Sequence, residues 1–168
     1  MEEELKVEVT STFRQLYQTL SLFTPSEINA IPFEGSWTSG QVVRHIIKST
    51  SGLKEVCDRN TQKLVANPGE KVPELKKLFL DFSTKMDSPE FIYPEVKEYD
   101  KELLLSTIQR IEKELVYITE NYDLGLTCME FEIPGFGNLT IYEIVSFAVI
   151  HTKRHIYQLT NIYKALRN

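Results

Sequence analysis

Apolar side chains recur at steps of three and four residues along four long segments of this chain, and this periodicity constrains the fold more than any other feature. In the first segment, Leu5, Val9, Phe13, Leu16 and Leu20 follow one another in this way. Such spacing places the apolar side chains on one face of an α-helix. The four segments cover residues 3–22, 37–65, 100–122 and 140–166. We therefore predict an all-α fold in which four amphipathic helices bury their apolar faces against one another.

Capping signals mark the predicted starts of three of these helices. Thr38 is followed three residues later by Gln41, and Thr140 is followed by Glu143 at the same spacing. Both pairs have the capping-box pattern, in which each side chain bonds the backbone of the other residue. Asp100 is a suitable N-cap for the third helix. The second, third and last helices therefore have defined beginnings.

The segment between the second and third helices has a different character. Residues 67–99 begin with Asn-Pro-Gly and carry four of the seven prolines. We expect one short helix over residues 74–82 within an otherwise extended connection. So long a connection allows the helices on either side to run parallel, as a crossover does in some bundles. The prediction is one domain over residues 1–168, a four-helix bundle with a long crossover between the second and third helices.

The segment before the last helix is open to two interpretations. Residues 126–138 alternate apolar and polar side chains and then continue into Pro-Gly-Phe-Gly. This pattern predicts either a short strand or an ordered loop that leads into the last helix.

Composition and charge argue against several classes of protein. The 24 acidic and 19 basic residues give a net charge of -5 and a pI of about 5.3, which argues against nucleic acid as the main ligand. The longest apolar stretches, such as residues 144–150, are too short to span a bilayer. The acidic start has no apolar signal-peptide core, so we expect a cytoplasmic protein. Cys57 and Cys128 form no CxxC pair and are expected to be free, buried thiols.

The three histidines are the most informative residues for function. His151 and His155 lie four residues apart in the last predicted helix, so their imidazoles share one face and suit two ligands of one metal ion. They continue the apolar stripe of that helix, where an imidazole has to be hydrogen-bonded, bound to a metal or facing a cavity. His45 lies in the middle of the second helix, beside Ser49 and Gly52. These small residues either leave room for a ligand or allow close packing of helices.

Three histidines from two facing helices match the open His₃ pattern of catalytic metal sites. We therefore favour a metal site formed by His45, His151 and His155. The alternative is that these side chains are hydrogen-bonded core histidines that bind no metal.

Three stretches of sequence carry a resemblance to a known family. Residues 37–45 read Trp-Thr-Ser-Gly-Gln-Val-Val-Arg-His, residues 136–143 read Phe-Gly-Asn-Leu-Thr-Ile-Tyr-Glu, and residues 151–158 read His-Thr-Lys-Arg-His-Ile-Tyr-Gln. In these motifs, and in the order of its helices with the long second connection, the chain resembles the DinB-like (YfiT-type) metal-binding four-helix bundles. The resemblance covers essentially the whole chain.

The resemblance implies a metal site and a range of activities. It implies that His45, His151 and His155 hold a divalent metal ion. Characterised members of the family include thiol-dependent transferases and isomerases, others are described as metal-dependent hydrolases, and homodimers are common. For this chain the resemblance therefore implies a small-molecule substrate, a low-molecular-weight thiol as cosubstrate in the case of transfer, and a homodimer.

The chain departs from the family pattern at one position. Many relatives carry an acidic residue directly after the first histidine of the last helix, whereas this chain has Thr152. The motif is therefore not HExxH, and a glutamate general base is absent from that position. The three expected ligands are unaffected, but a proton-transfer role for this position is put in doubt.

Three other residues near the expected site have two interpretations each. Glu143 is either a catalytic base or the acid of a capping box, and we favour the capping box. Trp37 either lines a substrate pocket or packs at the entrance of the second helix, and we favour packing. Gln158 lies one turn beyond His155 and either orients that histidine by a hydrogen bond or makes another buried polar contact. The catalytic residues remain unassigned.

Three basic residues lie close to the histidines in sequence. Arg44 either contacts an anionic substrate or forms a surface salt bridge. Lys153 and Arg154 lie between the two histidines of the last helix but point to other faces, so we expect them in solvent or at the rim of a dimer.

Two functions are compatible with these features. In the first, a Zn, Ni or Fe ion activates a thiol or water in an enzyme that transfers a thiol to a small electrophile or hydrolyses a small molecule. In the second, the metal only staples two helices of a dimeric interaction or stress-associated module. Because a structural zinc ion usually has four protein ligands and a fourth is not evident, we favour the enzyme.

Overall fold

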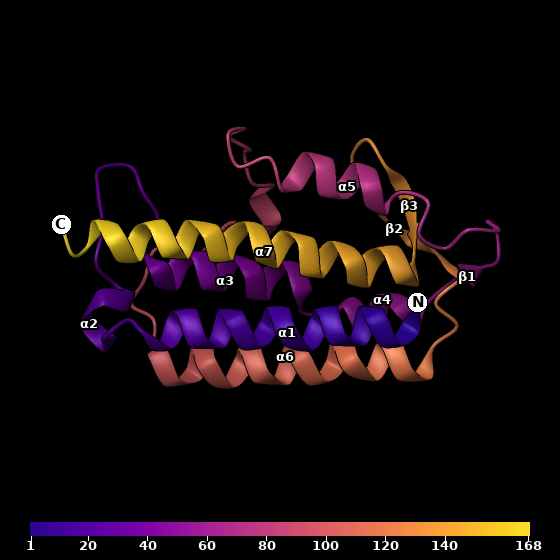
Figure 1. Ribbon diagram of the computed structural model, residues 1–168, viewed down its shortest axis with the longest axis horizontal. Coiled ribbons are helices and arrows are strands. Elements are labelled where there is room, and N and C mark those ends of the chain that lie inside the picture. The colour runs from indigo at the N-terminus through magenta and orange to yellow at the C-terminus, as the bar shows by residue number, and fades with distance from the viewer.

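Helices make up most of the fold, and the computed structural model, which describes residues 1–168, shows them lying side by side (Figure 1). In chain order the elements are α1 (Glu2–Ser21), α2 (Pro25–Ile28), α3 (Ser39–Thr50), α4 (Leu53–Cys57), β1 (Thr61–Gln62), α5 (Val72–Phe79), the 3-10 helix η1 (Glu90–Ile92), α6 (Lys101–Asn121), β2 (Thr127–Ile133), β3 (Gly137–Thr140) and α7 (Ile141–Ala165). None of the helices combines the length and the apolar character needed to cross a membrane.

The predicted capping boxes form at the starts of α3 and α7. The Gln41 N–H donates to Thr38 Oγ1 at 3.1 Å, and the Thr38 N–H donates to Gln41 Oε1 at 3.0 Å. Thr140 and Glu143 make the corresponding pair of bonds at 3.0 and 3.1 Å. Each box satisfies N–H groups that have no partner inside the helix, so these two helices begin where the sequence predicts.

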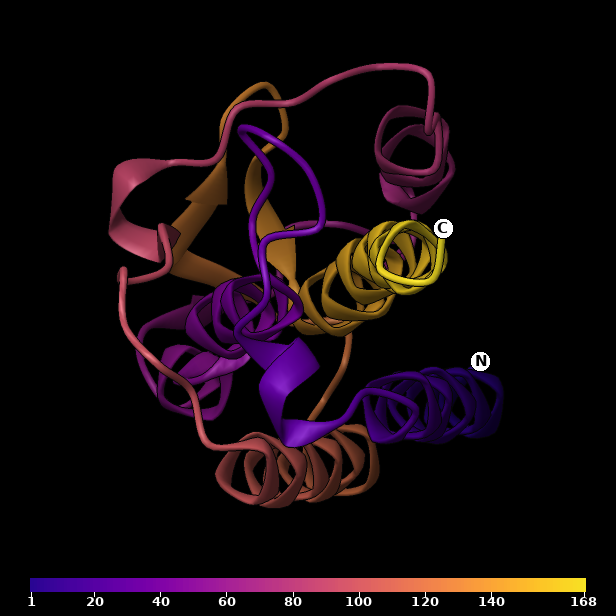
Figure 2. The ribbon, with the colours of Figure 1, turned by 90° about the vertical axis from the view of Figure 1, so that its left-hand side faces the viewer.

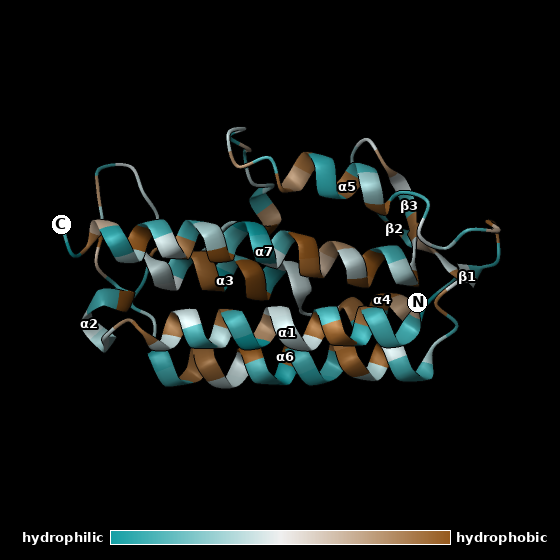
Figure 3. Ribbon diagram, viewed as in Figure 1, coloured by the Kyte–Doolittle hydropathy of each residue, from teal (hydrophilic) through white to brown (hydrophobic).

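The apolar stripes of the long helices form one core. Hydrophobic and hydrophilic bands recur along each of these helices, as Figure 3 shows. The stripe of α1 that includes Phe13, Leu16 and Leu20 is fully buried. Burial of such side chains supplies most of the stability of helices that would be marginal in isolation.

Helix α1 packs between α6 and α7, and α3 packs against α7 and α6 (Figure 2). The side chain of Lys101 at the start of α6 donates to the Ser21 carbonyl at the end of α1, so these two helices are antiparallel. Helices α3 and α6 run in the same direction (Figure 1). The prediction that the long connection allows parallel helices is therefore confirmed.

The expectation of an all-α fold is corrected by a small antiparallel sheet with the strand order β1-β2-β3. Thr61 pairs with Cys128, and Thr127 pairs with Thr140. Of the two interpretations of residues 126–138, the strand is the correct one. The turn between β2 and β3 contains Gly135, whose φ of +86° favours glycine. The fold is thus mostly helical with a small three-stranded sheet.

The predicted second helix is shorter than expected. Instead of continuing to residue 65, it breaks after Thr50 and resumes as α4, which ends at Cys57. Ser51 is extended, and Gly52 has a φ of +88°, in the left-handed region. This backbone turns the chain before α4 begins, and residues 61–62 then join the sheet.

Replacing Gly52 with alanine should lower the free energy of unfolding by about 1–2 kcal/mol, because the left-handed conformation is unfavourable for a residue with a Cβ. The added Cβ would meet only Glu55 Oε2, at 3.9 Å, so the cost is conformational and not steric. Urea denaturation measures the change. Ser51→Ala, at an exposed neighbouring position with ordinary φ, serves as the control and should be close to neutral. Equal stability of the two variants would contradict the prediction.

Candidate metal centre

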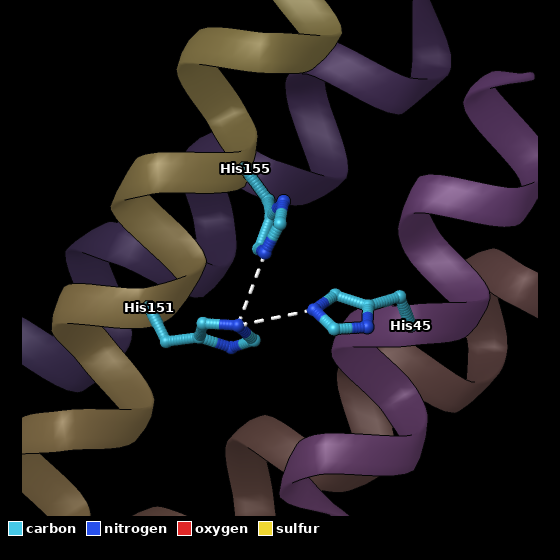
Figure 4. Close-up of side chains that lie close together, drawn as sticks. All are labelled: His45, His151 and His155. Carbon is cyan, nitrogen blue, oxygen red and sulfur yellow. Dashed lines mark hydrogen bonds between the residues drawn. The ribbon is translucent and has the colours of Figure 1, made fainter. Parts of the chain in front are cut away.

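The three histidines meet between α3 and α7 (Figure 4). His45 extends from the middle of α3, and His151 and His155 extend from successive turns of α7. The three side chains are buried, with exposed fractions of 2%, 6% and 8%. The structure therefore brings together all three residues that the sequence places at one site.

The Nε2 atoms of the three rings converge on one point. His151 Nε2 lies 3.1 Å from His45 Nε2 and 3.0 Å from His155 Nε2 (Figure 4). Two nitrogen ligands about 2.0–2.1 Å from a zinc ion lie about 2.9–3.4 Å apart for angles between about 90° and 109° at the metal. The two separations from His151 therefore fit pairs of nitrogens that share one ion.

The opposite nitrogen of each ring faces an oxygen atom. His45 Nδ1 lies 3.0 Å from the carbonyl oxygen of Ile92, and His155 Nδ1 lies 2.8 Å from Gln158 Oε1. His151 Nδ1 lies 3.2 Å from Ser49 Oγ. Because the Ser49 hydroxyl donates its proton to the Ile46 carbonyl at 2.9 Å, its oxygen is free to accept from His151. Each Nδ1–H therefore has an acceptor.

The oxygen partners of the Nδ1 atoms favour one set of tautomers for the three rings. A neutral imidazole carries one proton, and the three Nδ1 atoms hold it for hydrogen bonds to their oxygen partners. In these tautomers the Nε2 atoms carry lone pairs, and His151 Nε2 lies 3.1 Å from His45 Nε2 and 3.0 Å from His155 Nε2. Lone pairs at this distance repel one another unless a cation lies among them. The donor set thus fits a divalent metal ion.

Burial also keeps the three rings neutral. It lowers the pKa of His45 and lowers the pKa of His151 well below its usual value. Burial, followed by the proximity of His45, lowers the pKa of His155 to about 3. Neutral imidazole is the form that binds metal ions, so near neutral pH the rings need lose no proton before binding.

Aromatic side chains surround the histidines. The Trp37 ring lies 5.3 Å from the His45 ring, and the Phe147 ring stacks on His151 at 5.5 Å. Phe79 at the end of α5 packs against Phe147 at 5.0 Å. These rings lower the local polarity and exclude water from the site, which strengthens electrostatic interactions within it. Trp37 therefore packs at the entrance of α3, as favoured from the sequence, and also against a candidate ligand.

The comparison with protein families identifies the family of the chain. A family model described as the DinB superfamily matches residues 8–159, which include the three histidines and most of the chain. The chain belongs to the DinB superfamily. No curated protein and no solved structure matches it. The resemblance inferred from the motifs is therefore confirmed at the level of the family.

Two polar residues of this DinB superfamily member have roles that the sequence analysis considered, the favoured one for Glu143 and one of two open alternatives for Gln158. Glu143 is the acid of the capping box, and its Oε1 also accepts the Lys71 N–H at 2.8 Å. Gln158 accepts the hydrogen bond that orients His155. Cys57 and Cys128 are free and buried, as expected.

Of the basic residues near the histidines, Arg44 forms the salt bridge expected as one alternative. Its guanidinium donates two hydrogen bonds to Glu95, at 2.9 and 3.1 Å. Lys153 lies 3.5 Å from Glu8 of α1. Arg154 differs from the expectation of a solvated or dimer-rim residue, because it donates to the backbone carbonyls of Phe79 and Asp81.

Three partners of the histidines were not foreseen in this role. Ser49 was expected either to leave room for a ligand or to allow close packing of helices, but its Oγ lies 3.2 Å from His151 Nδ1. Its position four residues after His45, on the same helix face, is the signal that could have identified it. Ser88 and Ile92 lie 43 and 47 residues after His45, within the long connection. No local sequence pattern indicates that they would contact this histidine.

Proposed function

We propose that this DinB superfamily protein binds one divalent metal ion through His45, His151 and His155 and uses it in an enzymatic reaction on a small molecule. The reaction is transfer of a low-molecular-weight thiol to an electrophile, or hydrolysis, and the ion is Zn, Ni or Fe. In this proposal α1, α3, α6 and α7 act as a four-helix bundle that holds the site, and the protein works in the cytoplasm as a homodimer.

The observation that carries the proposal is that the Nε2 atoms of the three histidines lie close together while their Nδ1 atoms face oxygen atoms. When the Nδ1 atoms donate to these oxygens, the inner lone pairs of the Nε2 atoms are available to a cation. Only the three histidines make up the ligand group, and a site with three protein ligands keeps a position for a reactant. That open position favours catalysis over a purely structural role.

The protein residues hold and orient the site, and the ion supplies its reactivity. A divalent ion with neutral imidazole ligands lowers the pKa of a thiol or water next to it and so provides a nucleophile near neutral pH. In thiol transfer a sulfur–carbon bond forms, the bond from carbon to the leaving group breaks, and the thiol proton departs with the leaving group. Ser49, Gln158 and the Ile92 carbonyl keep the three rings in position for this chemistry.

Two carboxylates, Glu143 near the start of α7 and Glu95 beside Arg44, are engaged in other contacts. Glu143 accepts from Thr140 and Lys71, and Glu95 accepts from Arg44. Thr152 is fully buried and its hydroxyl has no hydrogen-bond partner. Proton transfer is therefore assigned to the reactants and solvent rather than to a general base of the protein.

The test of catalysis uses zinc-loaded protein with L-cysteine and monobromobimane for thiol transfer, and p-nitrophenyl acetate for hydrolysis. We expect a rate above background that is lost on chelation while far-UV circular dichroism shows the helices intact. His151→Ala, which removes the nitrogen shared by both close contacts, is the matched inactive control. Bound metal without any metal-dependent turnover of either probe would contradict the enzymatic proposal.

The burial of the histidines favours a second candidate, in which the metal only staples α3 to α7. Exposed fractions of 2–8% leave little of the rings in contact with solvent. In that case chelation would unfold the protein or lower its melting temperature strongly, because metal binding would be part of the folding free energy. The same chelation experiment therefore distinguishes the two functions.

Replacing Gln158 with leucine should weaken zinc binding by about 10–100-fold, the usual effect of removing a hydrogen bond that orients a ligand histidine. The leucine leaves His155 Nδ1–H without its acceptor at 2.8 Å. Competition titration with a chromogenic chelator measures the affinity. Asn161→Ala, at an exposed position on the same helix, is the control and should bind zinc as the parent does. Unchanged affinity in Gln158→Leu would show that Gln158 does not orient the ligand.

A further inference from the structure

The chain between α5 and η1 crosses from α7 to α3 on the side of the histidines away from α1 and α6. Figure 2 shows this segment, residues 80–92 with η1 included, leaving α5 and running along the side of the bundle to η1. We call it the strap. Ser88 Oγ lies 3.3 Å from His45 Nδ1, and the Ile92 carbonyl lies 3.0 Å from the same atom. The strap therefore touches the candidate metal centre directly.

One end of the strap is attached to α7 by Arg154. The guanidinium of this residue donates to the carbonyls of Phe79 at 3.1 Å, Asp81 at 3.0 Å and Thr84. The planar fork of arginine suits several acceptors at once, and hydrogen bonds from a charged donor are stronger than neutral ones. Phe82 adds a stacked contact with Tyr157, with ring centroids 4.2 Å apart.

The other end is attached to α3. Lys48 Nζ donates to the Tyr93 carbonyl at 2.8 Å, directly after the strap. Glu95, two residues further on, forms salt bridges with Lys48 and Arg44. The strap is thus held on the α7 side by Arg154, which directly precedes His155. On the α3 side it is held by Arg44 and Lys48, which lie on either side of His45 in the sequence.

Between these attachments the strap has little support of its own. Within residues 85–91 no backbone N–H donates to another backbone group. Most of its side chains are exposed, and Ile92 at its end is the one that is buried. Segments with few buried contacts and few internal hydrogen bonds open at low free-energy cost.

We propose that residues 80–92 form a movable strap that closes the metal centre, and that Arg154 is the positioning residue that holds it shut. The proposal rests on the proposed function, because a catalytic metal has to admit its substrate. The histidines are almost fully buried with the strap in place. Opening of the strap therefore gives small molecules access to the site, and release of Arg154 from the three carbonyls is the step that permits it.

Chemical modification of the histidines tests access without requiring bound metal or activity. Diethyl pyrocarbonate modifies neutral imidazoles, and the only three histidines of the chain are those of the site. In metal-free protein we expect Arg154→Ala to react at least about tenfold faster than the parent. Lys153→Ala removes a neighbouring positive charge that contacts Glu8 and not the strap, so it is the matched control and should react at the parental rate.

Phe82→Ala provides a second test with little risk to the fold, because this side chain is exposed. It removes the stacking on Tyr157, and we expect a smaller acceleration in the same direction. Hydrogen–deuterium exchange in both variants should become faster at the hydrogen-bonded amides of the strap, those of Leu80, Thr84 and Ile92, and stay unchanged in α3 and α7. Parental histidine reactivity in both variants, or faster exchange throughout α7, would overturn the proposal.

The two proposals fail in different ways. If the parent binds no metal but Arg154→Ala exposes the histidines, the proposed function fails and the strap remains. If the parent binds metal and the histidines of Arg154→Ala and Phe82→Ala are as protected as those of the parent, the proposal of a movable strap is rejected and the proposed metal centre is retained.

Discussion

Replacing His151 with alanine should abolish binding of a divalent metal, from about one ion per chain in the parent to none in the variant. His151 Nε2 lies 3.1 Å from His45 Nε2 and 3.0 Å from His155 Nε2. The variant therefore keeps only two ligands and loses the one that lies close to both. Zinc sites supply about 10–16 kcal/mol of binding free energy. Loss of one of three ligands therefore costs about 4 kcal/mol, which is about a thousandfold in affinity.

Elemental analysis of protein purified without chelator measures this effect directly. Thermal denaturation gives a second measure, since zinc at 100 times its dissociation constant stabilises the parent by about 2.7 kcal/mol. For a chain of this size that corresponds to a rise in melting temperature of roughly 5–10 °C, which we expect to be absent in His151→Ala. Lys153→Ala, two residues away on the same helix, should retain both the metal and the rise. A parent that remains metal-free after incubation with Zn, Ni, Fe and Mn salts would contradict the metal site.

The helices and the histidine cluster could be predicted because both depend on local spacing. Helical periodicity brings His151 and His155 to one face, and the capping boxes at Thr38 and Thr140 mark where α3 and α7 begin. Two antiparallel helices then bring His45 opposite the pair. None of these steps requires knowledge of contacts between distant parts of the chain beyond the packing of apolar faces.

The sheet and the break in the second helix could not be predicted from local patterns. Strand β1 contains only Thr61 and Gln62, and its partner strand begins 65 residues further along the chain at Thr127. Two residues carry no periodicity that distinguishes a strand from a helix end. Gly52 is compatible with a helix interior, and its left-handed φ becomes evident only in the folded chain.

The surroundings of the site depend on backbone groups, and these leave no trace in the residue pattern. His45 is oriented by the carbonyl of Ile92, and Arg154 holds the carbonyls of Phe79 and Asp81. Every residue has a carbonyl, so the identity of these partners follows from the path of the connection alone. A side chain that the sequence analysis places in solvent, such as Arg154 between the two predicted ligands, can therefore bind backbone carbonyls in the folded chain.

Replacing Glu143 with alanine should destabilise the protein by about 2–4 kcal/mol and leave metal binding unchanged. The carboxylate is 2% exposed, and its two oxygens accept the N–H groups of Thr140 at 3.0 Å and Lys71 at 2.8 Å. Without it the buried Thr140 N–H and the half-buried Lys71 N–H both lose their partner, and an unsatisfied donor costs about 1–3 kcal/mol. Glu143 precedes His151 by eight residues, about 12 Å along the helix, so its loss does not reach the ligands.

Thermal denaturation should show a fall in melting temperature of roughly 5–12 °C for Glu143→Ala, with the parental metal content below the transition. Glu102→Ala, which removes an exposed glutamate from the first turn of α6, is the matched control and should change stability by less than about 0.5 kcal/mol. The bond to Lys71 is the reason for the difference, because it ties the start of α5 to the start of α7 as well as capping the helix. A stable Glu143→Ala variant that binds metal but has lost turnover would instead assign this carboxylate to catalysis.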